Sequence, residues 1–172
     1  MRSSGSSSAV TSSAEHRPSS LTGSLAAARL VLCGGRGLGS REGFFAMVEL
    51  AELLGGQAAG TRGALDAKWI AHDREIGLSG VRTAPEVYVG FGVSGANFHT
   101  IGMEHAGTII AVDPDRSARI HQLAHCSVYA DAAGCIRGLT ERVRALDRGA
   151  PGFDPVALVK GYFQELSQQQ TL

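Results

Sequence analysis

A glycine-spaced turn directly after an apolar run is the part of this sequence best suited to chemistry. The run ends at Val89, and Gly90, Gly92 and Gly95 follow with the spacing GxGxxG. Glycine permits the tight turn and close backbone approach that this spacing implies, and the N–H groups at a following helix start then face a pyrophosphate. A second apolar run ends at Asp113, where a carboxylate would accept a hydrogen bond from a ribose hydroxyl. The pattern predicts a bound dinucleotide, with a purely structural glycine turn as the alternative.

Alternating strand and helix patterns surround this turn. Runs typical of buried parallel strands lie at 28–33, 57–60, 87–89, 108–112 and 126–130. Helical spacing of apolar residues lies at 41–54, 96–103, 133–146 and in a last helix after Asp154-Pro155. This alternation predicts a doubly wound α/β fold, a mainly parallel sheet with helices on both faces. The apolar stripe of the last helix could cover that sheet or dock onto a partner.

Composition bounds the domain organisation and excludes several function classes. Residues 1–24 are rich in serine and predict a disordered leader or linker, followed by a domain over 25–150 and a C-terminal helix over 151–172. The leader could be an organelle transit peptide. A formal net charge of zero gives no footprint for nucleic acid. No apolar run approaches the roughly 18 residues of a membrane span. Cysteines odd in number and without CxxC spacing predict free thiols, neither a disulfide framework nor a metal site.

Further motifs stand in a fixed order around the glycine turn. They are Cys33-Gly-Gly-Arg-Gly-Leu38, Gly60-Thr-Arg-Gly-Ala-Leu-Asp66, Ile76-Gly-Leu-Ser-Gly80, Ala84-Pro-Glu-Val-Tyr88 and Gly92-Val-Ser-Gly-Ala-Asn-Phe-His99. From about residue 29 to about residue 131, the chain resembles the FAD-binding C-terminal domain of the electron transfer flavoprotein alpha subunit. The resemblance implies a Rossmann-like domain, FAD as the cofactor, and an electron carrier rather than a turnover enzyme.

The resemblance also implies roles for individual side chains. Arg36 would face a phosphate, Arg62 would lie against the isoalloxazine ring, the Ser79 hydroxyl would reach the flavin N5, and His99 would stabilise the reduced ring near its N1 and C2 carbonyl as a donor or imidazolium. Ser94 and neighbouring N–H groups would hold the pyrophosphate. The complete predicted cofactor-binding set is Arg36, Thr61, Arg62, Ser79, Gly80, Gly92, Ser94, Gly95, Ala96, His99, Asp113 and Asp131.

The residues by themselves leave alternatives open at four of these positions. Arg36 could be a solvated surface arginine, and Arg62 could form an ion pair with Asp66. His99 could be a structural histidine, and Asp131 could cap a helix. No nucleophile with a base, acid–base pair or metal-ligand cluster emerges, so we predict no catalytic residue and no metal ligand.

Four positions depart from the family pattern. Leu78, Val81 and Phe98 stand where polar residues are common, and Glu75 stands in place of a glutamine. The short length together with Leu78, Val81 and Phe98 motivates an alternative function, an accessory or structural subunit of a larger assembly built on a degenerate flavoprotein domain. The family's N-terminal domain has no counterpart here, so we expect an excised domain, a divergent short subunit or one piece of a split protein.

The resemblance implies partners and a compartment as well. An electron transfer flavoprotein beta-like subunit would form the heterodimer, acyl-CoA-type dehydrogenases would deliver electrons, and a quinone reductase or another respiratory acceptor would receive them. The expected location is the mitochondrial matrix in a eukaryote and the cytoplasm in a bacterium.

Overall fold

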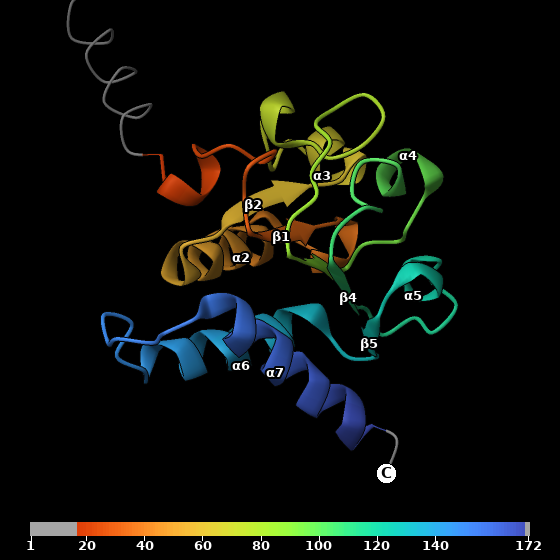
Figure 1. The fold of residues 1–172 in the computed structure, drawn as a ribbon. Helices are drawn as coiled ribbons and strands as arrows, with labels where there is room; N and C mark the ends of the chain where they lie inside the picture. The colour runs from red at the N-terminus through yellow and green to blue at the C-terminus, as the bar shows by residue number, and fades with distance from the viewer. Residues whose placement is uncertain (1–16, 171–172) are drawn as a thin grey trace, which may run out of the picture.

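A computed structural model describes residues 17–170 and contains one wholly parallel sheet of five strands (Figure 1). The strand order is β2-β1-β3-β4-β5. The strands are β1 (Leu30–Gly34), β2 (Gln57–Gly60), β3 (Val87–Phe91), β4 (Thr108–Val112) and β5 (Cys126–Val128). Parallel neighbours require crossover connections, which place helices against the faces of the sheet. The predicted doubly wound α/β class is confirmed.

The long helices lie on one face of the sheet and the shorter α4 and α5 on the other (Figure 1). The helices are α2 (Arg41–Leu54), α3 (Arg62–Asp66), α4 (Asn97–Thr100), α5 (Ile120–Leu123), α6 (Ala132–Arg144) and α7 (Pro155–Gln169). Three 3-10 turns complete the set: η1 (Ser19–Leu21), η2 (Arg36–Leu38) and η3 (His72–Arg74). The predicted helix over 96–103 is therefore only one turn, α4, followed by further turns.

Strand β3 shows how the sequence builds two apolar layers. Val87, Val89 and Phe91 face the layer under α2, α6 and α7, whereas Tyr88 faces the opposite layer. Successive side chains of a strand point to opposite faces, and every residue of β3 is buried. This explains why the strand reads as a continuous apolar run rather than an alternating one.

Local capping interactions set the limits of helices α2 and α7. The Ser40 hydroxyl accepts a hydrogen bond from the Gly43 N–H at the start of α2, and Gly55 ends that helix in the left-handed conformation with φ of 68°. Asp154 caps α7 by accepting from the N–H of Val156, with Pro155 in the first turn. These helix limits agree with the sequence prediction.

The packed region extends beyond the predicted domain limits of 25 and 150. Residues 1–16 of the predicted leader lie outside the described residues, but the assignment of residues 17–24 to that leader is wrong. Ser20 and Leu21 are buried, and the guanidinium of Arg74 donates to the Ser20 and Gly23 carbonyls. Composition misses this because Arg74, not local apolar periodicity, holds the segment.

The last helix packs on the sheet. Phe163 of α7 is fully buried, and its ring lies 5.9 Å from that of Phe91 on β3. Of the two possibilities left open by its apolar stripe, the structure shows coverage of the sheet. Trp69, whose role the sequence left as packing, lies 6.0 Å from the ring of Phe44. No helix within residues 17–170 has the length and apolarity needed to cross a membrane.

Candidate functional site

A pocket of about 940 Å³ lies at the carboxyl ends of four adjacent strands. Its walls are Gly35, Arg36 and Gly37 after β1; Thr61, Arg62 and Gly63 after β2; Glu75, Ile76, Leu78 and Ser79; Gly92, Val93, Ser94, Ala96, Phe98 and His99 after β3; and Asp113, Asp115, Ser117, Ala118 and Arg119 after β4. The connection from β1 runs to β2 on one side while β3 lies on the other, so the pocket spans the topological switch point of the sheet. Ligands of open α/β sheets bind in this position.

Glycines allow the loops after β1 and β3 to pack backbone against backbone at the centre of this pocket. The Gly37 N–H donates to the Gly92 carbonyl at 3.0 Å. A Cβ atom added at Gly37 would lie 2.6 Å from the Cα of Gly92, and Gly92 itself has φ of 66°. A side chain at either position would force the two loops apart. The glycines therefore serve close approach of these two loops, a contact that the sequence pattern did not specify.

Two predicted arginines line the pocket in different electrostatic states. Arg36 is exposed, and its aliphatic chain lies close to Gly63, since a Cβ there would be 2.9 Å from the Arg36 Cγ. Arg62 forms an ion pair with Asp66, with Nε to Oδ1 at 3.0 Å, and this hydrogen bond raises the pKa of Arg62. The alternative reading of Arg62 as an ion-pair residue is thus present in the structure, although Arg62 still borders the pocket.

The Ser79 hydroxyl is engaged within the protein. It donates to the carboxylate of Glu75, with distances of 3.1 Å and 3.3 Å to the two oxygens. Glu75 is only 2% exposed, and the Nε2 atom of His72 lies 3.9 Å from its Oε1. A hydroxyl has one proton, so Ser79 donates either to Glu75 or to a ligand. The predicted donation to a flavin N5 requires that proton to turn away from Glu75.

His99 differs from its expected role as a donor or imidazolium for the ligand. It is 5% exposed; its Nδ1 lies 3.0 Å from the Ile76 carbonyl oxygen and its Nε2 2.7 Å from the Tyr88 hydroxyl. A carbonyl only accepts, so Nδ1 carries the proton and Nε2 accepts from Tyr88. Burial lowers the pKa of His99 from 6.5 to about 4. The neutral ring joins two walls of the pocket, as the alternative of a structural histidine predicts.

Nine of the twelve predicted residues line this pocket, whereas Gly80, Gly95 and Asp131 do not. Asp131 caps α6 by accepting from the Gly134 N–H at 3.0 Å, which was its alternative reading. A Cβ at Gly80 would lie 2.2 Å from the Glu75 carbonyl oxygen, and one at Gly95 would lie 2.3 Å from the Ile120 nitrogen. Both glycines thus shape loops behind the pocket wall.

The sequence prediction also missed residues of the wall. Arg119, Asp115 and Ser117 follow β4 in a loop that the prediction entered only at Asp113. The sequence could have predicted these residues, because every loop at the carboxyl end of a central parallel strand reaches the same edge of the sheet. Leu78 and Phe98 were noted as departures, and they form an apolar rim that is 56% and 71% exposed.

The chemistry of this pocket fits a dinucleotide such as FAD. Its volume lies near the upper end of the roughly 300–1,000 Å³ usual for ligand sites. Arg36 and Arg62 place guanidinium groups in the pocket wall, a chemistry that suits anionic groups, and Asp113 places a carboxylate there, a chemistry that suits a ribose hydroxyl. Gly37 and Gly92 let the two loops that line the pocket pack backbone against backbone. Within the described residues, no group of three or more His, Cys, Asp or Glu side chains is placed to hold a metal ion.

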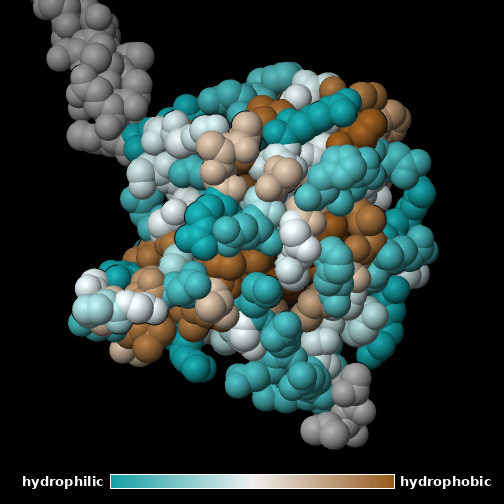
Figure 2. Space-filling model, in the orientation of Figure 1, coloured by the Kyte–Doolittle hydropathy of each residue, from teal (hydrophilic) through white to brown (hydrophobic). Residues whose placement is uncertain are grey.

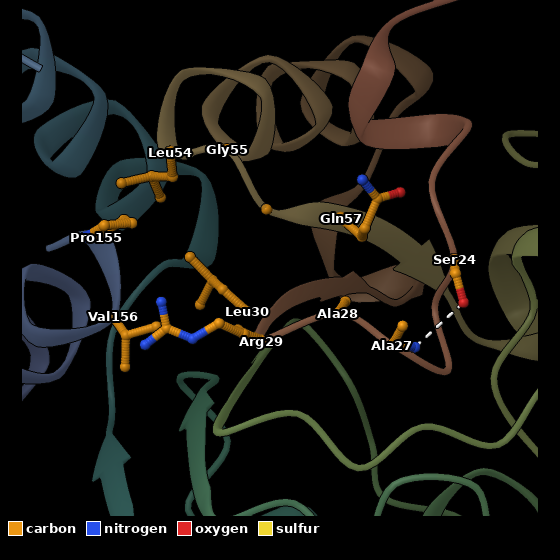
Figure 3. A pocket seen from close by; sticks show the side chains of 11 residues that line it. Ser24, Ala27, Ala28, Arg29, Leu30, Leu54, Gly55, Gln57, Pro155 and Val156 are labelled. Atoms are coloured by element: carbon orange, nitrogen blue, oxygen red, sulfur yellow. Dashed lines mark hydrogen bonds between the residues drawn. The ribbon is translucent and has the colours of Figure 1, made fainter. Parts of the chain in front are cut away.

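A second, smaller pocket of about 320 Å³ lies at the opposite edge of the sheet, near the amino ends of β1 and β2 (Figure 3). Its walls come from the start of β1, the end of α2 and the start of α7. The cation in it, Arg29, already forms a bidentate pair with Glu86, with bonds of 3.1 Å and 2.9 Å. None of the predicted site residues borders it.

Comparison with known proteins points to one family. Residues 24–104 match the family model described as the electron transfer flavoprotein FAD-binding domain. The chain is 40% identical over 124 residues to Protein FixB of Bradyrhizobium diazoefficiens, covering 72% of this chain and 34% of that relative.

Two further relatives carry the name electron transfer flavoprotein subunit alpha. The mitochondrial protein of Arabidopsis thaliana is 41% identical over 119 residues, covering 69% of this chain and 33% of its own length. The protein of Paracoccus denitrificans is 39% identical over 119 residues, covering 69% and 39%. The chain therefore spans about a third of the length of these curated relatives.

Proposed function

We propose that this chain holds FAD in the large pocket and works as the cofactor-bearing part of an electron carrier. Its resemblance to the FAD-binding domain of the electron transfer flavoprotein alpha subunit is confirmed by the family match and the relatives. The observation that carries the proposal is that nine predicted cofactor residues, from four strand ends and one further loop, line one pocket of dinucleotide size.

The order of the strands suggests how the ligand lies. Arg62 follows β2, Gly92 follows β3 and Asp113 follows β4, so the pocket extends across the sheet in that order. We place the ring system near Arg62 and Ser79, the pyrophosphate at the Gly92 turn and the ribose at Asp113. FAD, when bound, accepts and returns electrons at its ring system, and the protein provides binding, orientation and electrostatics.

The chain's own residues divide these tasks. The guanidinium of Arg62 stabilises negative charge that reduction places on the ring, and it does so more strongly where the ligand excludes water. His99, neutral and hydrogen-bonded on both nitrogens, fixes the Ile76 loop against α4 and keeps the pocket wall rigid. Glu75 sets the direction of the Ser79 hydroxyl. No acid–base group of the pocket is needed for proton abstraction or nucleophilic attack in this function.

The partners belong to the same proposal. We expect a beta-like subunit to complete a heterodimer, acyl-CoA-type dehydrogenases to donate electrons, and a quinone reductase to accept them. The apolar rim formed by Leu78 and Phe98 at the pocket mouth suits contact with a partner chain, because large exposed apolar side chains mark interaction sites. One relative is named as mitochondrial and another comes from Paracoccus denitrificans. We therefore propose the mitochondrial matrix in a eukaryote and the cytoplasm in a bacterium.

A second candidate is an accessory or structural subunit of a larger assembly. The same rim favours it, because Leu78 and Phe98 stand where polar cofactor contacts were expected, and the buried Glu75 engages the Ser79 hydroxyl. In this reading the pocket is inherited and its mouth serves protein contact.

An absorption spectrum of the gently purified native protein, with release and identification of any bound nucleotide, separates the two functions. A flavin spectrum with FAD released supports the electron carrier and directs attention to the beta-like partner. A colourless protein that binds no added FAD, even with its native partners present, contradicts the proposal and favours the structural subunit.

A further inference from the structure

We propose that Arg119 is a phosphate-binding residue which, together with Arg36, grips the diphosphate of the bound nucleotide from both sides of the Gly92 turn. The inference deepens the proposed function and rests on it, since it concerns the same pocket. The ligand chemistry that it specifies is a nucleoside diphosphate moiety, which FAD and ADP share.

The backbone around Arg119 is fixed against the glycine turn. The Ile120 N–H donates to the Ser94 carbonyl at 3.1 Å. A Cβ at Gly95 would lie 2.9 Å from the Arg119 carbonyl carbon. The loop after β4 therefore touches the loop after β3 directly, and Arg119 emerges beside the backbone groups proposed for the pyrophosphate.

The side chain of Arg119 is oriented but keeps most of its donors available. One Nη2 donates to the Asn97 Oδ1 at 3.1 Å, immediately beyond the glycine turn. Within residues 17–170 it has no ion-pair partner, in contrast to Arg62 with Asp66. The pocket also contains Asp115, but Ser117 donates to that carboxylate with both its N–H and its hydroxyl. A guanidinium has five N–H donors, so four remain for a ligand.

Arg36 lies on the other side of the Gly92 turn, also in a loop that contacts this turn. Its loop follows β1 and contacts the same turn through the Gly37 N–H and the Gly92 carbonyl, at 3.0 Å. It likewise has no ion-pair partner among the described residues and lines the pocket. Because β3 lies between β1 and β4, Arg36 and Arg119 flank the turn in the strand order.

Two guanidinium groups around one turn, neither in an ion pair within residues 17–170, match the chemistry of a diphosphate. Guanidinium forks bind phosphate oxygens with charge-assisted hydrogen bonds, which are about twice as strong as neutral ones. The other arginine of the β4 loop behaves differently: Arg116 lies over the Tyr129 ring at 4.2 Å and does not line the pocket. The loop thus assigns one arginine to packing and one to the pocket.

The test is the affinity of the full chain for FAD and for ADP, with Arg119→Gln compared with the parent and with Arg116→Gln as the matched control. ADP carries the diphosphate without the flavin, so its affinity measures the arginine–diphosphate contact separately from recognition of the flavin. We expect Arg119→Gln to weaken both ligands by about tenfold or more, the usual loss for a hydrogen bond to a charged group. Arg116→Gln should stay within about twofold, and raising the salt concentration should narrow the Arg119 difference.

The outcomes separate the inference from the function on which it rests. A parent that binds FAD, with an Arg119→Gln variant of equal FAD and ADP affinity, overturns the inference and leaves the proposed function standing. Loss of FAD binding with ADP binding intact also overturns it, because the contact would then lie at the flavin. If the parent binds ADP but not FAD, and Arg119→Gln lowers the affinity for ADP, the result supports the Arg119–diphosphate contact and refutes the flavin function. A parent that binds neither ligand, even with its native partners present, refutes both. Equal thermal unfolding of the ligand-free proteins shows that folding is not the cause.

Discussion

Acidification is expected to destabilise this protein through His99, the buried histidine of the pocket wall. Its Nδ1 donates to the Ile76 carbonyl and its Nε2 accepts from the Tyr88 hydroxyl, so the folded state holds the neutral ring. Protonation at Nε2 would place a charge at a 5% exposed site and turn a hydrogen-bond acceptor into a second donor. The folded protein therefore resists the proton that the unfolded chain accepts readily.

The size of the effect follows from the shift in pKa. The pKa of His99 falls from 6.5 to about 4, and each unit corresponds to about 1.36 kcal/mol. Because the folded pKa lies below the unfolded one, the contribution to stability is complete above about pH 6.5 and is lost as the pH falls toward and through about 4. Between about pH 7.5 and about pH 4.5, His99 alone should lower the free energy of unfolding by about 2–3 kcal/mol.

Urea denaturation of the parent and of His99→Gln across this pH range isolates the effect. The variant loses stability at neutral pH, but its amide does not titrate, and the carboxylates and other histidines change equally in both proteins. The difference in unfolding free energy between the two proteins should shrink as the pH falls. Parallel curves would refute the reasoning, as would an NMR titration that gives His99 an ordinary pKa.

Three other changes test separate parts of the structure. Gly92→Val should abolish FAD retention, because a Cβ there would lie 2.6 Å from the Gly37 carbonyl carbon; unchanged flavin content after gel filtration would make the turn purely structural. Arg74→Met should cost about 3 kcal/mol in chemical denaturation and speed amide exchange near Ser20, since the buried carbonyls of Ser20 and Ala58 and the part-buried carbonyl of Gly23 lose their donor; slow exchange there would contradict this. Phe163→Ala should lower the unfolding free energy by about 3–5 kcal/mol, and a value below about 1 kcal/mol would mean that α7 contributes little to the core.

Local sequence patterns predicted most of the fold because their physics is local. Ser40 and Gly55 delimit α2 through a hydroxyl cap and a left-handed residue, and Asp154 starts α7 in the same way. The alternation of strands and helices then fixes the fold class, since parallel strands need crossovers. Because carboxyl ends of parallel strands share one edge, Arg36, Arg62 and Asp113 were placed together correctly.

The features that the sequence did not predict depend on contacts between distant residues. Arg74, which donates a hydrogen bond to the Ser20 carbonyl, is 54 positions away in the chain, and no local pattern predicts that bond. His99 was assigned to the ligand, yet Tyr88 and Ile76 occupy its nitrogens from a strand and a separate loop. Asp131 kept its local role as a helix cap.

The sequence by itself determined the elements, the glycine turn and the edge of the sheet at which the site lies, because helix caps, strand burial and crossover topology depend on near neighbours in the chain. Only the tertiary structure decided which polar groups remain available to a ligand. It makes His99 neutral and brings Arg119 beside the turn, because these hydrogen bonds and this burial are set by packing between segments far apart in the sequence.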